Sequence, residues 1–122
     1  MQITGVDFVT VPTDDIEASR TFYGETLGLP FVKQWGDMPG MEFQAGNLTI
    51  AVMDPRAFGS GEPHPHRVPL ALQVPDVAAA RAELEAKGVQ FLGETIDSGE
   101  CHQALFRDPA GNVLDLHHRY AT

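Results

Sequence analysis

Three side chains near the end of the chain, His102, Asp115 and His117, are of the types that hold metal ions or move protons. Asp115 and His117 are two residues apart in a segment predicted as a strand, so they share one face of it. His102 lies on the neighbouring predicted strand, and the three side chains converge if its face is the same one. Two histidines and one carboxylate suit non-haem iron. The alternative, which we favour, is a polar cluster in a pocket wall that holds no metal.

The remaining candidates for metal binding or nucleophilic chemistry have simpler interpretations. The pair in His64-Pro65-His66 lies in a segment rich in Pro and Gly and is expected to be a solvated turn. Cys101 needs an activating base, but His102 beside it points to the other side of a strand, so we expect a small core residue. His118 falls on the face opposite His117 and is expected to pack or to lie in an interface. A single cysteine excludes an internal disulfide and every multi-cysteine metal motif.

The elements that must position these residues occur twice along the chain. Four features recur in the same order: a Val-Pro pair, a helical segment with Asp and Arg, a Gly followed by apolar residues, and a Gly-Asn turn. They begin at Val11, Asp15, Gly28 and Gly46 in the first half, and at Val74, Asp76, Gly88 and Gly111 in the second. Four matches in one order indicate tandem copies of one unit.

Each copy predicts a strand, a helix and three more strands. Alternation of apolar and polar residues marks the strands, and Asp-x-x-Glu at Asp14 and Glu17 predicts a capping box for the first helix. Asp76 is expected to cap the second helix, and Gly28 and Gly88 to end the two. The later strands are expected near Pro30–Trp35, Met41–Gln44, Leu48–Met53, Leu70–Val74, Val89–Glu94, Cys101–Arg107 and Val113–Arg119.

The predicted fold class is therefore α+β, with two tandem βαβββ modules forming a cupped mixed sheet around a cavity. Module one spans residues 1–54, a Pro-, Gly- and His-rich linker spans 55–67, and module two spans 68–122, all within a single domain.

Composition narrows the classes of partner. The 122 residues carry 17 acidic and 8 basic side chains, a net charge of −9, which disfavours nucleic acid and favours cationic ligands. No apolar run approaches the length of a membrane span, so we expect no membrane partner. The first residues contain neither a basic segment nor an apolar signal core, and we therefore expect a cytoplasmic location.

Two stretches resemble the signatures of the vicinal oxygen chelate superfamily. Phe22-Tyr23-Gly24-Glu25-Thr26-Leu27-Gly28-Leu29 is similar to its FY-x-x-x-LG-L pattern, and Asp108-Pro109-Ala110-Gly111-Asn112-Val113-Leu114-Asp115-Leu116 to its DP-x-GN-x-x-E-L pattern. The resemblance covers both modules and supports the fold. The superfamily includes glyoxalase I, ring-cleaving dioxygenases, epimerases, fosfomycin-modifying enzymes and drug-binding proteins of the bleomycin-resistance type, so the fold alone leaves the function open.

The resemblance also implies where a metal would bind, because enzymes of the superfamily hold one through His, Gln or Glu on the first and last strand of each module. Counted from the helix caps and checked by strand parity, these positions fall on Phe8, Ile50, Pro69 and Asp115. Three of these side chains have no donor atom, and one carboxylate cannot hold a divalent metal against water. The sequence therefore predicts no metal cofactor. A divalent metal at His102, Asp115 and His117 is the alternative.

Two functions follow from these expectations. The first is a metal-free binding protein for a small organic ligand, and the resemblance implies sequestration of an aromatic or cationic natural product, an antibiotic-resistance role. Its predicted ligand-binding residues are Phe8, Thr10, Trp35, Ile50, Gln73, His102, Asp115 and His117, with Met38 and Met41 beside Trp35. Phe22 and Tyr23 are assigned to the core.

The second function is a metal-dependent glyoxalase-type lyase or ring-cleaving dioxygenase, which would use His102, Asp115 and His117. In a metal-free variant of such an enzyme, Asp115 or His117 moves a proton. The sequence leaves open whether the chain is an enzyme at all. For a chain of this size, the resemblance to the superfamily implies a homodimer. The unpaired sheet edges of each module also favour pairing with a second chain, so a C₂ dimer is expected.

Overall fold

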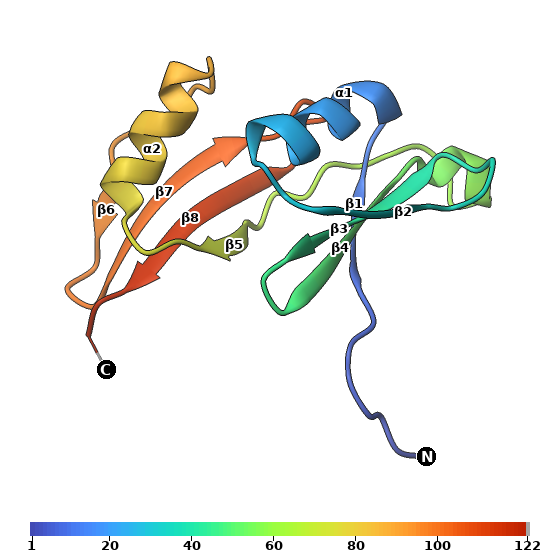
Figure 1. Ribbon diagram of the computed structural model, residues 1–122, viewed down its shortest axis with the longest axis horizontal. Coiled ribbons are helices and arrows are strands. Elements are labelled where there is room, and N and C mark those ends of the chain that lie inside the picture. The colour runs from blue at the N-terminus through green and yellow to red at the C-terminus, as the bar shows by residue number, and fades with distance from the viewer. Residues whose placement is uncertain (122) are drawn as a thin grey trace. The chain divides into compact units, whose positions relative to one another are not determined.

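The computed structural model describes residues 1–121 and divides the chain into two compact units, Met1–His64 and a second that begins at Pro65. Each unit contains one four-stranded sheet and one principal helix (Figure 1). The first unit contains β1 (Val9–Pro12), α1 (Ile16–Thr21), the π-helical turn η1 (Phe22–Thr26), β2 (Phe31–Gln34), β3 (Gly40–Ala45), β4 (Leu48–Met53) and the 3₁₀ turn η2 (Pro55–Phe58). The second contains β5 (Leu70–Gln73), α2 (Val77–Ala86), β6 (Ile96–Asp97), β7 (Cys101–Arg107) and β8 (Val113–Arg119).

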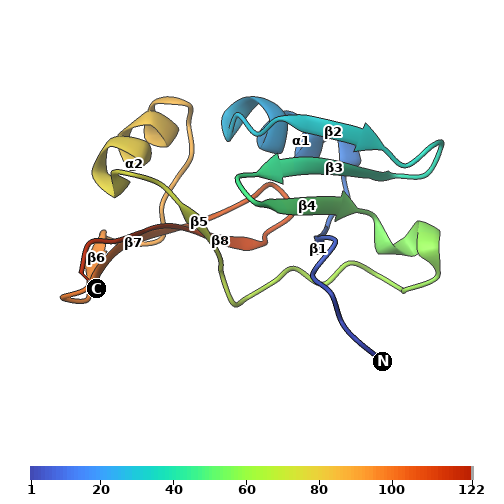
Figure 2. The same cartoon turned by 60° about the horizontal axis from the view of Figure 1, so that its bottom comes forward.

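The two sheets have the same topology. Their strand orders are β1-β4-β3-β2 and β5-β8-β7-β6, and in each the first strand of the unit runs parallel to the last. All other pairs are antiparallel. Figure 2 shows β2, β3 and β4 side by side in the first sheet. The predicted α+β class with two βαβββ modules is confirmed. Within residues 1–121, no helix is both long and apolar enough to cross a membrane.

The first helix begins one residue later than the capping box at Asp14 and Glu17 predicts. Asp15 is the N-cap, and its side chain accepts a hydrogen bond from the Ala18 amide at 3.1 Å. The Thr13 hydroxyl oxygen accepts from the Asp15 amide at 3.0 Å, and the Ser19 hydroxyl donates to the same oxygen at 2.7 Å. These local bonds fix residue 15 in the capping conformation and make the prediction for Asp14 wrong. The predicted cap at Asp76 is confirmed, since it accepts from the Ala79 amide at 3.0 Å.

Each helix packs on one face of its own sheet. In the first unit, Tyr23 of η1 lies against Phe43 with ring centroids 6.0 Å apart, and both are fully buried. Phe22 is buried beside Tyr23, as predicted. Met41 is also part of this core and not of a loop beside Trp35, because β3 begins at Gly40 and turns its side chain toward the helix. In the second unit the buried apolar side chains are Val77, Leu84, Ala104, Phe106, Leu114 and Leu116.

The strand predicted near Val89–Glu94 does not form. Phe91 makes an isolated bridge with Phe106, Gly93 adopts φ +82°, and the short strand β6 follows only at Ile96. Arg81 of α2 holds this irregular segment. Its guanidinium donates to the Gly93 carbonyl at 2.9 Å and lies 4.7 Å from the centroid of the Phe91 ring.

The repeat supplies a counterpart for this arginine in the first unit. There, Arg20 of α1 lies 5.6 Å from the centroid of the Phe31 ring and donates to Gln34 at 2.6 Å. The helix of each unit thus carries an arginine whose guanidinium lies over a phenylalanine ring in a later segment of the same unit.

Candidate functional site

The face of each sheet that is turned away from the helix, here called the far face, carries most of the predicted site residues. In the second sheet, β5 and β8 pair Leu70 with Leu114 and Leu72 with Leu116 on the helix side. Strand alternation then places the intervening pairs on the far face. The far face of the second sheet is made by Ala71, Gln73, Gln103, Leu105, Asp115 and His117.

These side chains form two rows across three strands. Asp115 pairs with Ala71 on one side and with Leu105 on the other. In the next row, His117 lies between Gln73 and Gln103, a residue that the sequence reasoning missed. Directly opposite residues in neighbouring strands have Cβ atoms about 5 Å apart, so each row presents a continuous surface. The predicted residues Gln73, Asp115 and His117 are therefore brought together on one face.

Asp115 is the most unusual polar group of the second unit. Its side chain is only 2% exposed, and its Oδ1 atom has no hydrogen-bond partner within the described part of the chain. Burial raises the pKa of Asp115, while His117 nearby and an amide contact from Ala104 lower it by less. An unpartnered buried carboxylate oxygen costs about 1–3 kcal/mol of folding free energy. Such a cost suggests that a group outside the chain completes the site.

His102 does not join Asp115 and His117, so the predicted convergence of the three is wrong. In the β7–β8 register His102 pairs with His118, and these two residues lie on the face opposite His117. The Nε2 atom of His102 is instead 3.4 Å from Asp97 Oδ2, and its ring lies 4.7 Å from the centroid of Tyr120. Among residues 1–121, no three His, Cys, Asp or Glu side chains are grouped so that they could share a metal ion.

In the first sheet, the far face contains Thr10 and Ala51, which pair across β1 and β4, and Glu42 and Lys33 on the next strands. Thr10 lies where it was predicted. Ile50 does not, because it pairs with Val9 and Phe43 on the helix side and is fully buried.

The hairpins before the last strands of the two units differ in length. Gly46 and Asn47 alone connect β3 to β4, whereas five residues, 108–112, connect β7 to β8. The two last strands therefore differ by one residue in their distance from the preceding Gly-Asn pair, and a one-residue slip exchanges the faces of a strand. The residue equivalent to Asp115 is Ala51, since Thr10 pairs with Ala51 as Ala71 pairs with Asp115.

Trp35 lies on the far face of the first sheet in a fixed orientation. Its indole Nε1–H donates to Glu42 Oε2 at 2.6 Å. The ring lies directly against Gly40, where an added Cβ atom would be 2.3 Å from Trp35 Cε3. The side chain is therefore held at its polar edge by a carboxylate and accommodated on one face by the absence of a side chain at residue 40.

Two more aromatic rings flank Trp35. The centroids of Phe8 and Phe58 are each 5.7 Å from the centroid of Trp35, Phe58 in an edge-to-face arrangement. Phe8 is 41% exposed and Phe58 38% exposed. We call Phe8, Trp35 and Phe58 the aromatic cluster. Phe8 and Trp35 were predicted site residues, whereas Phe58 was assigned to the linker.

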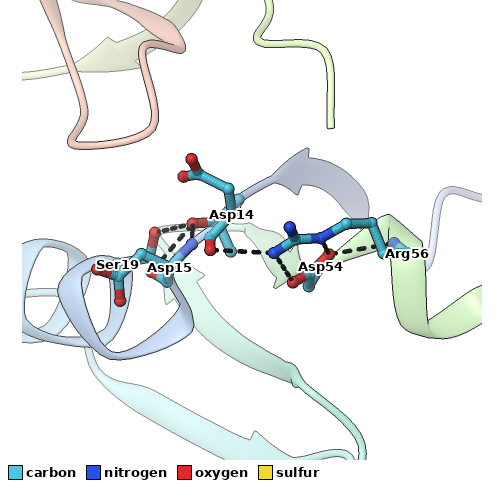
Figure 3. A network of polar contacts seen from close by, with 6 residues as sticks. Asp14, Asp15, Ser19, Asp54 and Arg56 are labelled. Carbon is cyan, nitrogen blue, oxygen red and sulfur yellow. Dashed lines mark hydrogen bonds and ion pairs between the residues drawn. The ribbon is translucent and has the colours of Figure 1, made fainter. Parts of the chain in front are cut away.

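A polar network fixes the turn that carries Phe58 (Figure 3). Arg56 of η2 forms a two-point ion pair with Asp54, whose oxygens lie 2.9 and 2.7 Å from the guanidinium nitrogens. The same guanidinium donates to the Asp14 carbonyl at 3.2 Å, which ties η2 to the start of α1. Arg56 holds the pKa of Asp54 below its ordinary value. The network anchors residues 54–58 and thereby positions the ring of Phe58.

The residues at the four equivalent positions of the two modules do not fit a metal centre. With the register corrected, these positions are Phe8, Ala51, Pro69 and Asp115. Only Asp115 has a donor atom, and the side chains that pair directly with it, Ala71 and Leu105, are apolar. A single carboxylate among apolar neighbours lacks the three or more protein ligands of a stable divalent site.

Comparison with known proteins identifies the family. The model of the Glyoxalase/Bleomycin resistance protein/Dioxygenase superfamily matches residues 5–116. An uncharacterized protein of Mycolicibacterium smegmatis (strain ATCC 700084 / mc(2)155) is 32% identical over 112 residues, which cover 89% of each chain. The crystal structure of TnmS3, an antibiotic binding protein from Streptomyces sp. CB03234, is 30% identical with a TM-score of 0.82 over 98% of both chains.

A more distant structure shares the fold alone. Lactoylglutathione lyase from Agrobacterium tumefaciens has a TM-score of 0.79 at 17% identity, over 96% of this chain and 95% of that one. Both a binding protein and an enzyme are thus built on this fold.

Proposed function

Because the chain belongs to the Glyoxalase/Bleomycin resistance protein/Dioxygenase superfamily, we propose that it binds a small aromatic or cationic natural product without a metal and sequesters it. The observation that carries the proposal is the chemistry of Phe8, Ala51 and Pro69, which fill three of the four equivalent positions and have no donor atoms. No bond is made or broken in this function. Capture lowers the free concentration of the compound, and with an antibiotic as the ligand it confers resistance.

The aromatic cluster supports the choice of an aromatic ligand. Phe8 and Phe58 are half-exposed although both are large and apolar, and Trp35 is held in place by Glu42 and Gly40. Rigid, partly exposed rings offer stacking surface at little cost in side-chain entropy. TnmS3, at 30% identity over 98% of both chains, is an antibiotic binding protein, which agrees with a ligand of this kind.

The acidic surface supports a cationic component. A net charge of −9 raises the local concentration of cations near the protein. Glu42 lies at the edge of the Trp35 indole, so a planar cation stacked on Trp35 also approaches a carboxylate. We therefore expect 9-aminoacridine, a planar cation, to bind more tightly than the neutral and nearly isosteric acridine.

Calorimetric titration with these two compounds tests the proposal, beside metal analysis of protein incubated with Fe²⁺, Ni²⁺ and Zn²⁺ and then desalted. We expect saturable binding of 9-aminoacridine, weakened about tenfold in Trp35→Leu, because stacking on an aromatic ring contributes about 1–2 kcal/mol. Phe91→Leu, a change on the helix side of the second sheet, is the control for lost aromatic packing. Near-stoichiometric retained metal, or no binding of either compound, would contradict the proposal.

We further propose that the chain forms a C₂ homodimer, which would close sheet edges that are unpaired in each unit. β2 and β6 are edge strands, and β2 is exposed along its whole length. Exposed edge strands favour pairing with a second chain. Sedimentation equilibrium is the direct test, and a monomer mass at micromolar concentration would refute the dimer.

A further inference from the structure

The far face of the second sheet carries a carboxylate oxygen, Asp115 Oδ1, that has no hydrogen-bond partner among residues 1–121. The oxygen lacks this partner although the Asp115 side chain is only 2% exposed. Its neighbours in the same row, Ala71 and Leu105, have no polar side-chain atoms. The side chains of its own row therefore cannot donate to this oxygen, whereas the next row and a bound ligand can.

The next row is suited to the rim of a binding site. His117 lies between Gln73 and Gln103, and within residues 1–121 none of the three side chains takes part in a hydrogen bond. Each of these groups can both donate and accept. The two rows thus place one buried acceptor between apolar neighbours, beside three uncommitted polar side chains. Ligand sites generally combine apolar walls with a few convergent polar groups.

We infer that this face recognises an aromatic ligand by one O–H or N–H donor at the edge of its ring, with Asp115 Oδ1 as the acceptor. The apolar walls formed by Ala71 and Leu105 accommodate the flat body of the ring beside that donor. His117, Gln73 and Gln103 bond to further polar atoms on the same ligand. This inference rests on the proposed function and adds to it the chemical group that is recognised.

The assignment gives Asp115 a role different from metal coordination. A ligand donor satisfies Asp115 Oδ1 directly, whereas a metal would require further donors where Ala71 and Leu105 lie. A phenolic hydroxyl and a protonated amine share the required chemistry. They differ in charge, and an experiment can separate them.

Three probes built on the same ring system test the inference: 2-naphthol, 1-naphthylmethylamine and 2-methoxynaphthalene. The first carries a neutral donor, the second a cationic donor, and the third has no donor. Affinities are measured by protein-detected NMR on the full chain, which also follows the imidazole signal of His117. We expect at least one donor probe to bind about tenfold or more tightly than 2-methoxynaphthalene, as a hydrogen bond to a charged group permits. The preferred donor probe identifies the neutral or the cationic class.

Two variants and one control assign that preference to Asp115. Asp115→Leu should reduce the ratio between donor and non-donor probes to about one, while 2-methoxynaphthalene binds at least as well as before. Asp115→Asn keeps an acceptor of the same size, so it should retain the binding of 2-naphthol and lose any preference for the amine. Glu83→Gln removes an exposed carboxylate on α2, whose partner is Lys87 at 3.8 Å, and should leave all three affinities unchanged.

The outcomes separate this inference from the proposed function. Equal affinity for all three probes, or a donor preference that persists in both Asp115 variants, overturns the role of Asp115 and leaves ligand binding intact. Failure of the unmodified protein to bind any of the naphthalenes overturns this inference, and failure to bind the two acridines as well overturns the proposed function. A donor preference that is lost in Asp115→Leu, together with a shift of the His117 imidazole signal on binding, supports the inference.

Discussion

Gly40→Ala is the substitution that most sharply tests how Trp35 is positioned. The added Cβ atom would lie 2.3 Å from Trp35 Cε3 and 2.9 Å from Cδ2, whereas an ordinary contact begins at 3.4 Å. The backbone at Gly40 cannot easily give way, because its carbonyl accepts from the Trp35 amide at 2.9 Å and its amide donates to the Met38 carbonyl at 2.9 Å. The indole must therefore move by about 1 Å or rotate away.

This movement has a predictable cost. Overpacking of this kind costs about 1–3 kcal/mol, and displacement of the indole also weakens the 2.6 Å hydrogen bond to Glu42. Replacing glycine by alanine lowers the entropy of the unfolded chain and returns about 0.4–1 kcal/mol. We expect a net loss of about 1–3 kcal/mol in the free energy of unfolding, and a fall of several degrees in Tm.

Urea denaturation and the emission spectrum of Trp35, the single tryptophan of the chain, measure both effects. The emission maximum should shift to longer wavelength as the indole leaves its place against Gly40. Gly5→Ala is the matched control, because a Cβ atom there meets nothing within 4 Å and its φ is not in the left-handed region. If Gly40→Ala had the same stability and emission as Gly5→Ala, the account of Trp35 would be wrong.

Three further predictions concern charged groups. Burial raises the pKa of Asp115 above its ordinary value of 3.8, so the ionised carboxylate opposes folding above pH 3.8 and not below it. Asp115→Asn should therefore increase the free energy of unfolding by about 1 kcal/mol at pH 7 and leave it unchanged near pH 3. Urea denaturation at the two pH values measures the difference. The Tyr120 hydroxyl donates to Asp97 at 2.6 Å and lowers the pKa of that carboxyl below 3.8. The hydrogen bond to the ionised carboxylate therefore stabilises the protein above pH 3.8, and this stabilisation is lost as the pH falls through the pKa of Asp97 in the folded protein. Tyr120→Phe should accordingly be less stable than the parent at pH 6 and equal to it near pH 2 in thermal melts, and a constant difference would contradict this. Arg56→Met should weaken the binding of 9-aminoacridine several-fold by releasing η2, whereas Arg119→Met, on the second unit, should not change it in the same calorimetric assay.

The sequence predicted the fold well because the signals that specify it are local and repeated. Strand alternation placed Gln73 and His117 on one face, and the register of β5 with β8 confirms it. The strands Leu48–Met53, Cys101–Arg107 and Val113–Arg119 were predicted with the observed bounds. The segment near Phe91 failed because Gly93 and the contacts of Arg81 favour an irregular path over a ladder.

The site was harder to predict because faces depend on register, and register depends on hairpin length. Ile50 was assigned to the far face, whereas its pairing with Val9 and Phe43 places it on the helix side, and Ala51 takes the position equivalent to Asp115. The face on which His102 lies could have been predicted from the sequence. Ala104 and Phe106 follow it at two-residue spacing on the same face of the strand, and both are apolar core residues. The contact of Trp35 with Gly40 and Glu42 could not have been predicted from the sequence, because it depends on an irregular pairing between β2 and β3.

Metal-independent binding of an aromatic ligand can be measured by titration with 9-aminoacridine in the presence and in the absence of EDTA. We expect saturable binding with the same dissociation constant in both buffers, because the positions occupied by Phe8, Ala51 and Pro69 offer no metal donors. Binding that disappears with the chelator and returns when a divalent metal is added would contradict it.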